Sequence, residues 1–437
     1  MYIELDIELR IMNESFLHFV WQFQYFTQHD LYTQEGEPLS IFNVGFLNSN
    51  AGPDFSQAKI QIGKIEWVGN VEIHIKSSDW LLHNHGKDKS YDNVILHVVW
   101  QDDERIKRTD GTLIPTIELK NRVSKDLLKK YAQLVSSSAS IPCGKTFNQI
   151  DPILKTSMLD KAILQRLESK SDEILKMVNF NKGDWEETTY QWLAKSFGFK
   201  INSEPFLQLA KSLPYKIIQK HSSSLLQIEA LLFGQAGMLQ AKTKDEYVTT
   251  LFNEYEFFSK KYSLSETALH FSQWKFLRLR PANFPTLRIA QFARLMFTNP
   301  NLFSKIKESK STTELVQLIV ATPSEYWQTH YHFAKKCKSK IAPLGKSSKE
   351  NLLINSMVPL LAAYGKYSDD YTYIDRATEI LQCLPAEKNK ITRCWEELGL
   401  TVKSSFDSQA LIEQYNNMCQ KRFCLNCVVG TSILKPR

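Results

Sequence analysis

Hydrophobic and polar positions in the first 120 residues follow two different periods. After Asn13, apolar residues recur at the spacing of one helix face from Phe16 to Tyr25, which predicts a helix that begins near Glu14. Strand-like runs follow at 39–46, 58–63, 67–76, 93–100 and 113–119. Gly, Asn, Asp and Lys separate these runs, so hairpins and an antiparallel or mixed sheet are predicted.

The period changes to helical after a polar tract. The sequence "SSSAS" at 136–140 is typical of a linker, and Asp151 followed by Pro152 is a typical helix start. Helical stripes then recur without a strict repeat. The predicted fold is α+β, with a mixed α/β module over residues 1–141 and a larger, basic all-α domain over residues 142–437.

Composition excludes disorder and a membrane span. Hydrophobic residues make up 43% and charged residues 23% of the chain, which is typical of a soluble globular protein. No apolar run approaches the roughly 18 residues that a membrane helix needs. Residues 1–10 are acidic and alternating rather than a signal peptide. A cytoplasmic protein without a membrane partner is therefore predicted.

The net charge of +7 is unevenly distributed. Residues 1–141 carry 14 Lys and Arg against 19 Asp and Glu, and the rest of the chain carries 40 against 28. A basic domain joined to a mildly acidic module indicates a polyanion partner such as nucleic acid. The alternative is that the positive charge only keeps the protein soluble. No protein partner follows from the sequence.

One predicted strand carries three chemically active groups on one face. Between residues 71 and 76 the odd positions are apolar, while Glu72, His74 and Lys76 are polar. Side chains alternate between the faces of a strand. An acid, an imidazole and an amine therefore project from the same side.

The sequence before this strand completes a recognisable motif. Pro53-Asp54, seventeen residues and then Glu72-Ile73-His74 resemble the signature of the PD-(D/E)XK, or restriction-endonuclease-like, nucleases. The resemblance implies that Asp54 and Glu72 chelate Mg²⁺ or Mn²⁺, and that Glu14 contributes from the first helix. Carboxylate oxygens suit such hard cations. The alternative is a plain turn followed by a solvent-facing strand.

His74 departs from this signature, because a lysine usually stands there to position the attacking water. Either His74 acts as general base or metal ligand, or Lys76 reaches back from the next pleat.

Histidines concentrate around the motif. The chain has ten, and four of them lie between residues 74 and 97. We predict His83, His85, Asp88 and His97 as additional ligands or as an alternative metal site. A histidine within an apolar strand, such as His97, is otherwise a satisfied core residue.

Three of the seven cysteines crowd the C-terminal end. Cys419, Cys424 and Cys427 have the spacing C-x₄-C-x₂-C, which suits Zn²⁺ or a [4Fe–4S] cluster. We predict Cys143 as the fourth ligand, with Cys394 as the second choice. The arrangement is similar to that of some PD-(D/E)XK nucleases, in which a distant cysteine and a C-terminal trio hold an iron–sulfur cluster. Unliganded thiols are the alternative.

Arginines alternate with aromatic residues in "WKFLRLRPANFPTLRIAQFARL". Arg278, Arg280 and Arg288 are the predicted nucleic-acid contacts, because arginine suits phosphate and base stacking. The alternative is a helix–loop–helix joint in which these arginines cap carbonyls or pair with acids.

The whole chain resembles an uncharacterised bacterial family, a domain of unknown function, through blocks that include "NAGPDF", "GNVEIHIKSSDW", "RLRPANFPTLRI" and "CLNCVVG". No activity follows from that likeness. The predicted function is metal-dependent cleavage of DNA or RNA. The alternatives are an inactive nucleic-acid-binding or scaffold protein, and a His/Asp metallohydrolase of a small substrate.

Overall fold

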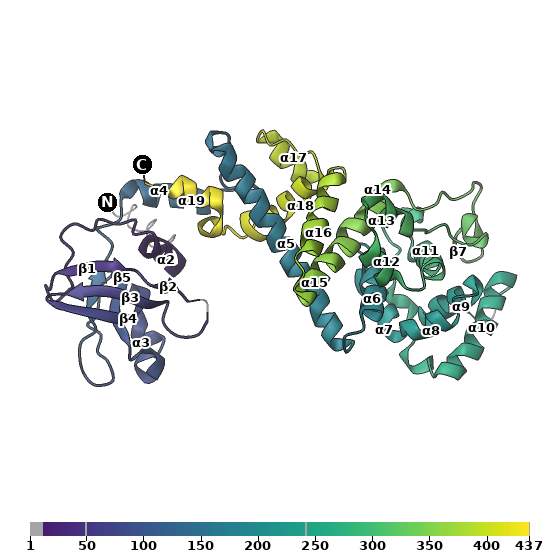
Figure 1. Cartoon of the computed structure of the whole chain (residues 1–437), viewed down its shortest axis with the longest axis horizontal. Helices are drawn as coiled ribbons and strands as arrows, with labels where there is room; N and C mark the ends of the chain where they lie inside the picture. The colour runs from purple at the N-terminus through teal and green to yellow at the C-terminus, as the bar shows by residue number, and fades with distance from the viewer. Residues whose placement is uncertain (1–11, 49, 241–242, 437) are drawn as a thin grey trace. The chain divides into compact units, whose positions relative to one another are not determined.

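The computed structural model describes residues 12–48, 50–240 and 243–436 (Figure 1). The N-terminal stretch on which the signal-peptide prediction rests lies outside these residues. The chain divides into two compact units. The first comprises Met1–Leu159, Cys394–Leu400 and Gln414–Arg437, and the second comprises Asp160–Arg393 and Thr401–Glu413.

A mixed sheet forms the centre of the first unit. Its strands are β1 (Leu39–Asn43), β2 (Phe46–Leu47), β3 (Phe55–Ile62), β4 (Ile65–Lys76), β5 (Val94–Gln101) and β6 (Thr116–Glu118). The order is β1-β3-β4-β5-β6, with β2 paired to β3. The pairs β1–β3 and β3–β4 are antiparallel, whereas β4–β5 and β5–β6 are parallel. The predicted strands and the mixed sheet are confirmed.

Helix α2 (Glu14–Gln22) begins where the sequence predicts. The side chain of Asn13 accepts a hydrogen bond from the Phe16 amide and caps the helix. The apolar face of α2 lies in the same core cluster as Val71 and Ile73 of β4. Glu72 and His74 alternate with these residues and therefore face the other side of the sheet. A short helix, α3 (Asp79–Leu82), follows β4 before the chain enters β5.

The C-terminal segment belongs to the first unit. Cys424 and Leu434 lie in the core cluster that contains the sheet and α4 (Lys125–Val135), and Leu425 and Ile433 pack against it. Helix α19 (Val428–Leu434) contains Ile433 and Leu434. The predicted boundary after residue 141 therefore falls inside this unit. Apolar side chains far away in the sequence complete its core.

The second unit is largely helical, as predicted. Its helices, including two that cross into the first unit, are α5 (Pro152–Phe180), α6 (Trp185–Phe197), α7 (Ser203–Ser212), α8 (Tyr215–Lys220), α9 (Leu225–Gln235), α10 (Glu246–Tyr262), α11 (Pro285–Thr298), α12 (Leu302–Glu308), α13 (Thr312–Leu318), α14 (Lys346–Leu352), α15 (Val358–Ser368), α16 (Thr372–Cys383), α17 (Lys390–Glu397) and α18 (Ser405–Glu413). Pro152 is the first residue of α5, as the Asp151-Pro152 pair predicts.

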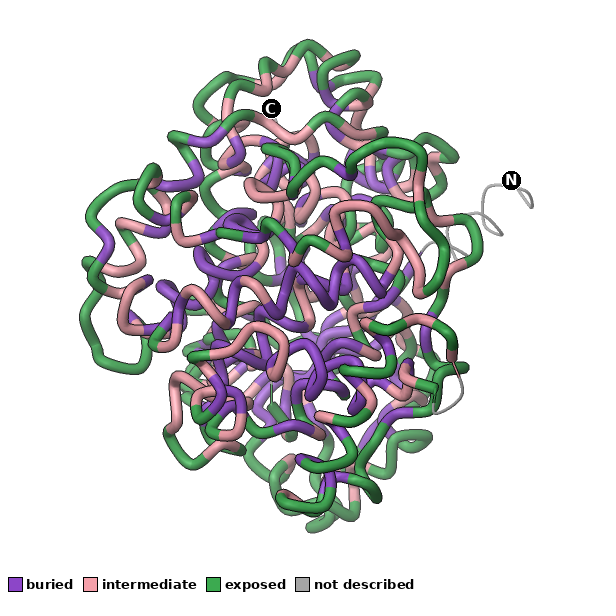
Figure 2. Tube along the Cα trace, turned by 90° about the vertical axis from the view of Figure 1, so that its right-hand side faces the viewer, coloured by how far each residue is buried: buried purple, intermediate pink, exposed green. Residues whose placement is uncertain are grey.

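The second unit also contains a small hairpin that periodicity did not predict. Strands β7 (His330–His332) and β8 (Lys335–Lys336) pair antiparallel. Helices α9 and α11 are buried along most of their lengths, and Figure 2 shows burial along the described residues. Among the described residues, no helix combines the length and the apolar character that crossing a membrane requires.

Candidate metal centre

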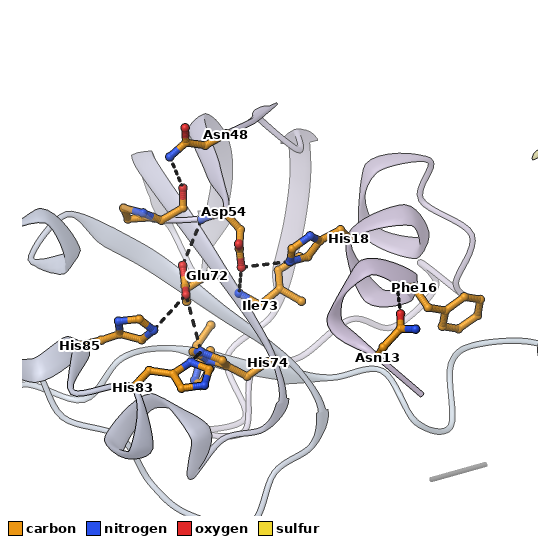
Figure 3. Close-up of polar contacts among 12 residues, drawn as sticks. Asn13, Phe16, His18, Asn48, Asp54, Glu72, Ile73, His74, His83 and His85 are labelled. Carbon is orange, nitrogen blue, oxygen red and sulfur yellow. Dashed lines mark hydrogen bonds and ion pairs between the residues drawn. The ribbon is translucent and has the colours of Figure 1, made fainter. Parts of the chain in front are cut away.

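Asp54 and Glu72 meet at one end of the β3–β4 pair. The antiparallel register places Phe55 opposite Val71, so the preceding Asp54 lies beside the residues that follow Val71. The Asp54 amide donates a hydrogen bond to Glu72 Oε2 at 3.1 Å, and the Ile73 amide donates to Asp54 Oδ2 at 3.0 Å (Figure 3). The two motif acids are therefore held against each other by the backbone.

Helix α2 adds two polar side chains to this place. His18 Nε2 lies 3.2 Å from Asp54 Oδ2. Glu14 is one turn earlier on α2, and residues four apart share a helix face. Its carboxylate interacts electrostatically with Asp54 and His18. The sequence predicts Glu14 here but not His18, although the Glu14–His18 spacing alone was sufficient to suggest it.

Glu72 and Glu14 both have a raised pKa. Burial and then the Asp54 charge raise the pKa of Glu72 to about 8. Burial and then the same Asp54 charge raise the pKa of Glu14. Burial and a nearby negative charge both disfavour the ionised form of a carboxyl group. A bound divalent cation would reverse this effect, because it favours the ionised carboxylates.

Glu72 makes the stability of the metal-free protein depend on pH. Its folded pKa is about 8 against an ordinary value of 4.5, so the folded state retains a proton that the unfolded chain releases. The contribution of Glu72 to the free energy of unfolding is complete below about pH 4.5. It is lost as the pH rises towards 8, at roughly 1.4 kcal/mol per pH unit.

We therefore expect Glu72→Gln to stabilise the chelator-treated protein at pH 9 relative to the wild type, and much less at pH 5. Urea denaturation of both proteins at the two pH values measures this difference. Parallel pH dependences would contradict a protonated Glu72.

Imidazoles gather beside the acids. His74 Nδ1 lies 2.8 Å from His97 Nε2, and His74 Nε2 lies 3.1 Å from His83 Nδ1. Glu72 Oε1 lies 3.3 Å from His85 Nε2 and 3.6 Å from His74 Nε2. Figure 3 shows Glu72 between the Asp54 side and the histidine side of the site.

Local backbone structure explains this gathering. The parallel register of β4 and β5 pairs Glu72 with His97. His83 and His85 flank Asn84, which has left-handed dihedral angles (φ 59°, ψ 29°). Asn tolerates this conformation better than most residues. The reversal directs both histidines towards β4, and Tyr91 stacks on the His85 ring at 3.9 Å between centroids.

His74 is enclosed rather than available to water. Its side chain is 1% exposed, and burial together with His85 and His83 lowers its pKa to about 3. Both ring nitrogens face other imidazoles. His74 is therefore a neutral member of the cluster, without the free nitrogen that the predicted general base needs.

Two other predicted residues lie away from the cluster. Lys76 is exposed, and its ammonium is 3.9 Å from Asp103. Asp88 is exposed and accepts a hydrogen bond from the Ser90 amide. His97 is fully buried beneath His74. Neither Lys76 nor Asp88 contacts Asp54, Glu72 or the clustered histidines through any described interaction at hydrogen-bond distance.

Four cysteines surround an apolar cavity in the first unit. Cys143, Cys419, Cys424 and Cys427 line it together with Trp395. Burial and neighbouring thiols raise the pKa of Cys143 to about 12, and raise that of Cys419 as well. Cys143, the first-choice fourth ligand, lines this cavity, whereas Cys394 does not. Cys383 is exposed.

The four cysteine sulfurs do not form as tight a group as the histidine nitrogens do in the described part of the chain. Among the described residues, His74, His83 and His85 are the group whose metal-ligating atoms all lie within 4.8 Å of one another. No three of the four thiols meet that condition. Zinc would hold its sulfurs about 3.5 to 4 Å apart.

The predicted arginine contacts differ in exposure. Arg278 and Arg280 are exposed. Arg288 is 5% exposed, donates to Asn283 Oδ1 and Gln291 Oε1, and stacks on Phe199. The structure does not place Arg288 where it could reach a nucleic-acid backbone. Its position on the inner face of α11 is the reason.

Residues 14–390 match the model of a family described as "Protein of unknown function (DUF2851)". The chain therefore belongs to this family. Searches of curated proteins and of solved structures gave no match.

Proposed function

We propose that this DUF2851 protein is a metal-dependent hydrolase of phosphodiester bonds in nucleic acid. The observation that carries the proposal is the meeting of Asp54, Glu72 and Glu14 at one end of the sheet, where burial and then the Asp54 charge raise the pKa of Glu72 and of Glu14. Glu72 is buried, and Asp54 and Glu14 are half-buried beside it, so a cation between them would relieve the repulsion of their charges. A divalent ion stabilises the charge of phosphodiester hydrolysis and activates water.

The order of elements supports the PD-(D/E)XK resemblance. Helix α2 precedes an antiparallel β1–β3–β4 sheet, and the short helix α3 joins β4 to the parallel strand β5. Asp54 and Glu72 would hold Mg²⁺ or Mn²⁺. Mg²⁺ is commonly bound through one or two carboxylates while it keeps several waters, so Glu14 has a role in orienting such a water.

The remaining polar residues position these acids. The Ile73 amide and His18 fix the Asp54 carboxylate, and the Asp54 amide fixes Glu72. His74 occupies the usual lysine position as a neutral group, and Lys76 is turned to Asp103. Water activation therefore falls to the metal and the α2 side chains in this proposal.

Nucleic acid is the substrate class that charge favours. The residues after 141 carry 40 basic against 28 acidic side chains, and such an excess attracts a polyanion. The exposed Arg278 and Arg280 are the proposed phosphate contacts. A small phosphodiester is the second candidate substrate, because the histidines next to the acids also suit a small-substrate metallohydrolase.

Glu72→Gln tests this proposal directly. We expect it to abolish Mn²⁺-dependent cleavage of plasmid and single-stranded DNA or RNA, because the amide cannot neutralise a cation. Glu66→Gln is the matched control, since Glu66 lies on the same strand but is exposed and paired with Lys59. Equal activity of the two variants would contradict the proposal. Cleavage of a chromogenic diester without cleavage of nucleic acid would favour the second substrate.

We also propose that the four cysteines hold a metal cofactor, either Zn²⁺ or a [4Fe–4S] cluster. The thiols converge from residue 143 and from the C-terminal segment on one cavity. Bound in this way, the cofactor would fasten the C-terminal segment within the first unit.

A further inference from the structure

The histidines beside Glu72 form a second ligand set with its own geometry. His74, His83 and His85 bring their ring nitrogens within 4.8 Å of one another. Glu72 Oε1 completes the set, at 3.3 Å from His85 and 3.6 Å from His74. Ligands bound tetrahedrally at 2.0–2.1 Å are about 3.3 Å apart. The separations of 3.1, 3.3 and 3.6 Å are close to this value.

The inner histidine is oriented as a metal ligand usually is. Its Nδ1 faces His97 Nε2 at 2.8 Å. When Nδ1–H donates there, the Nε2 lone pair of His74 points at His83 and Glu72. A ligating imidazole commonly donates its other N–H to a fixed outer partner. The lone pairs of His74 and Glu72 then converge on one point, which a cation can occupy.

The surroundings hold the set in place and leave it an entrance. Trp80 is buried, and its ring centroid lies 5.3 Å from that of His85 and 5.4 Å from that of His97. His83 is exposed whereas His74 is buried, so an ion can reach the site from the His83 side. A proposed metal site requires such an entry path and fixed ligands.

We propose that His74, His83, His85 and Glu72 bind a first-row transition metal ion of the Zn²⁺ class. Imidazole nitrogens select such ions, whereas the carboxylate pair of Asp54 and Glu72 suits Mg²⁺ or Mn²⁺. The histidine site rests on its own contacts and meets the proposed function only at Glu72. Glu72 turns Oε2 to Asp54 and Oε1 to the histidines, so it is the ligand that the two ions would share.

Metal titration of the full chain tests this site. The chelator-treated protein is titrated with Co²⁺, because imidazole-bound Co²⁺ lacks the thiolate charge-transfer bands that ions at the cysteines produce. We expect one equivalent to show tetrahedral ligand-field bands without a thiolate charge-transfer band, in addition to any Co²⁺ that the cysteines bind. His83→Ala and His85→Ala should each lower the Co²⁺ affinity of this site at least about 100-fold. Even the loss of a residue that only orients a ligand lowers metal affinity 10- to 100-fold.

The controls separate this site from the others. His29→Ala removes an exposed imidazole that lies 3.1 Å from Asp30, and this variant should bind Co²⁺ like the wild type. Asp54→Asn should still bind one Co²⁺ ion at the histidines, whether or not the wild-type protein cleaves nucleic acid. Because His83 is exposed, His83→Ala should keep its circular dichroism spectrum; His83→Gln repeats the test if it does not. Wild-type stoichiometry and spectra in the folded histidine variants would overturn the proposal.

Discussion

Asp54→Asn is expected to reduce Mn²⁺-dependent cleavage of nucleic acid at least about 100-fold, because the loss of outer metal partners alone costs 10- to 100-fold. The asparagine can still accept a hydrogen bond from the Ile73 amide and face His18, so the backbone arrangement should persist. What disappears is one negative charge next to Glu72. The pKa of Glu72 should therefore fall, since Asp54 is the second-largest cause of its rise.

The comparison that makes this result specific is Asp30→Asn. Asp30 is exposed and has a positive φ of 52°, a conformation in which Asn is also tolerated. The Asp30→Asn variant should cleave nucleic acid at the wild-type rate. The assay measures initial rates on plasmid at saturating Mn²⁺, with thermal melting as a check of folding. Cleavage retained by Asp54→Asn would assign the activity to another site or to a contaminant.

Cys143→Ser is expected to lose the cofactor of the cysteine cavity and to lower the melting temperature by at least about 10 °C. A structural metal contributes several kcal/mol or more to folding, and each kcal/mol moves the melting temperature by roughly 2 to 4 °C in a domain of this size. Elemental analysis of anaerobically purified protein measures iron and zinc. A brown wild-type protein with iron would identify the cluster.

Cys383→Ser is the matched control, because Cys383 is exposed on a helix of the second unit. It should change neither metal content nor melting temperature. A wild-type protein without iron or zinc, combined with an unchanged melting temperature in Cys143→Ser, would leave the four residues as plain thiols.

Local sequence was sufficient for the first-unit strands and for one part of the site. The alternation at 71–76 places Glu72 and His74 on one face, and the structure has them there. The helix start near Glu14 and the Asp151-Pro152 start were also predicted, because each depends on a few neighbouring residues.

Packing between distant segments was not predictable in the same way. His18 reaches Asp54 only because α2 lies on the sheet. The neutral state of His74 requires that other histidines and Trp80 cover it. Arg288 has the same local sequence signals as Arg280, yet helix α11 turns it inward. Periodicity assigns such residues to elements but does not say which neighbour covers them.

The position of Cys424 and Leu434 in the first-unit core has a consequence for how the chain folds. During synthesis the sheet leaves the ribosome first, and these residues follow only after the second unit has been made. Contacts of such high sequence separation form late and slow the folding of the unit. Part of the apolar surface of the nascent sheet therefore stays exposed to solvent during synthesis. Until residues 424–434 emerge, this exposed apolar surface makes the nascent unit prone to aggregation.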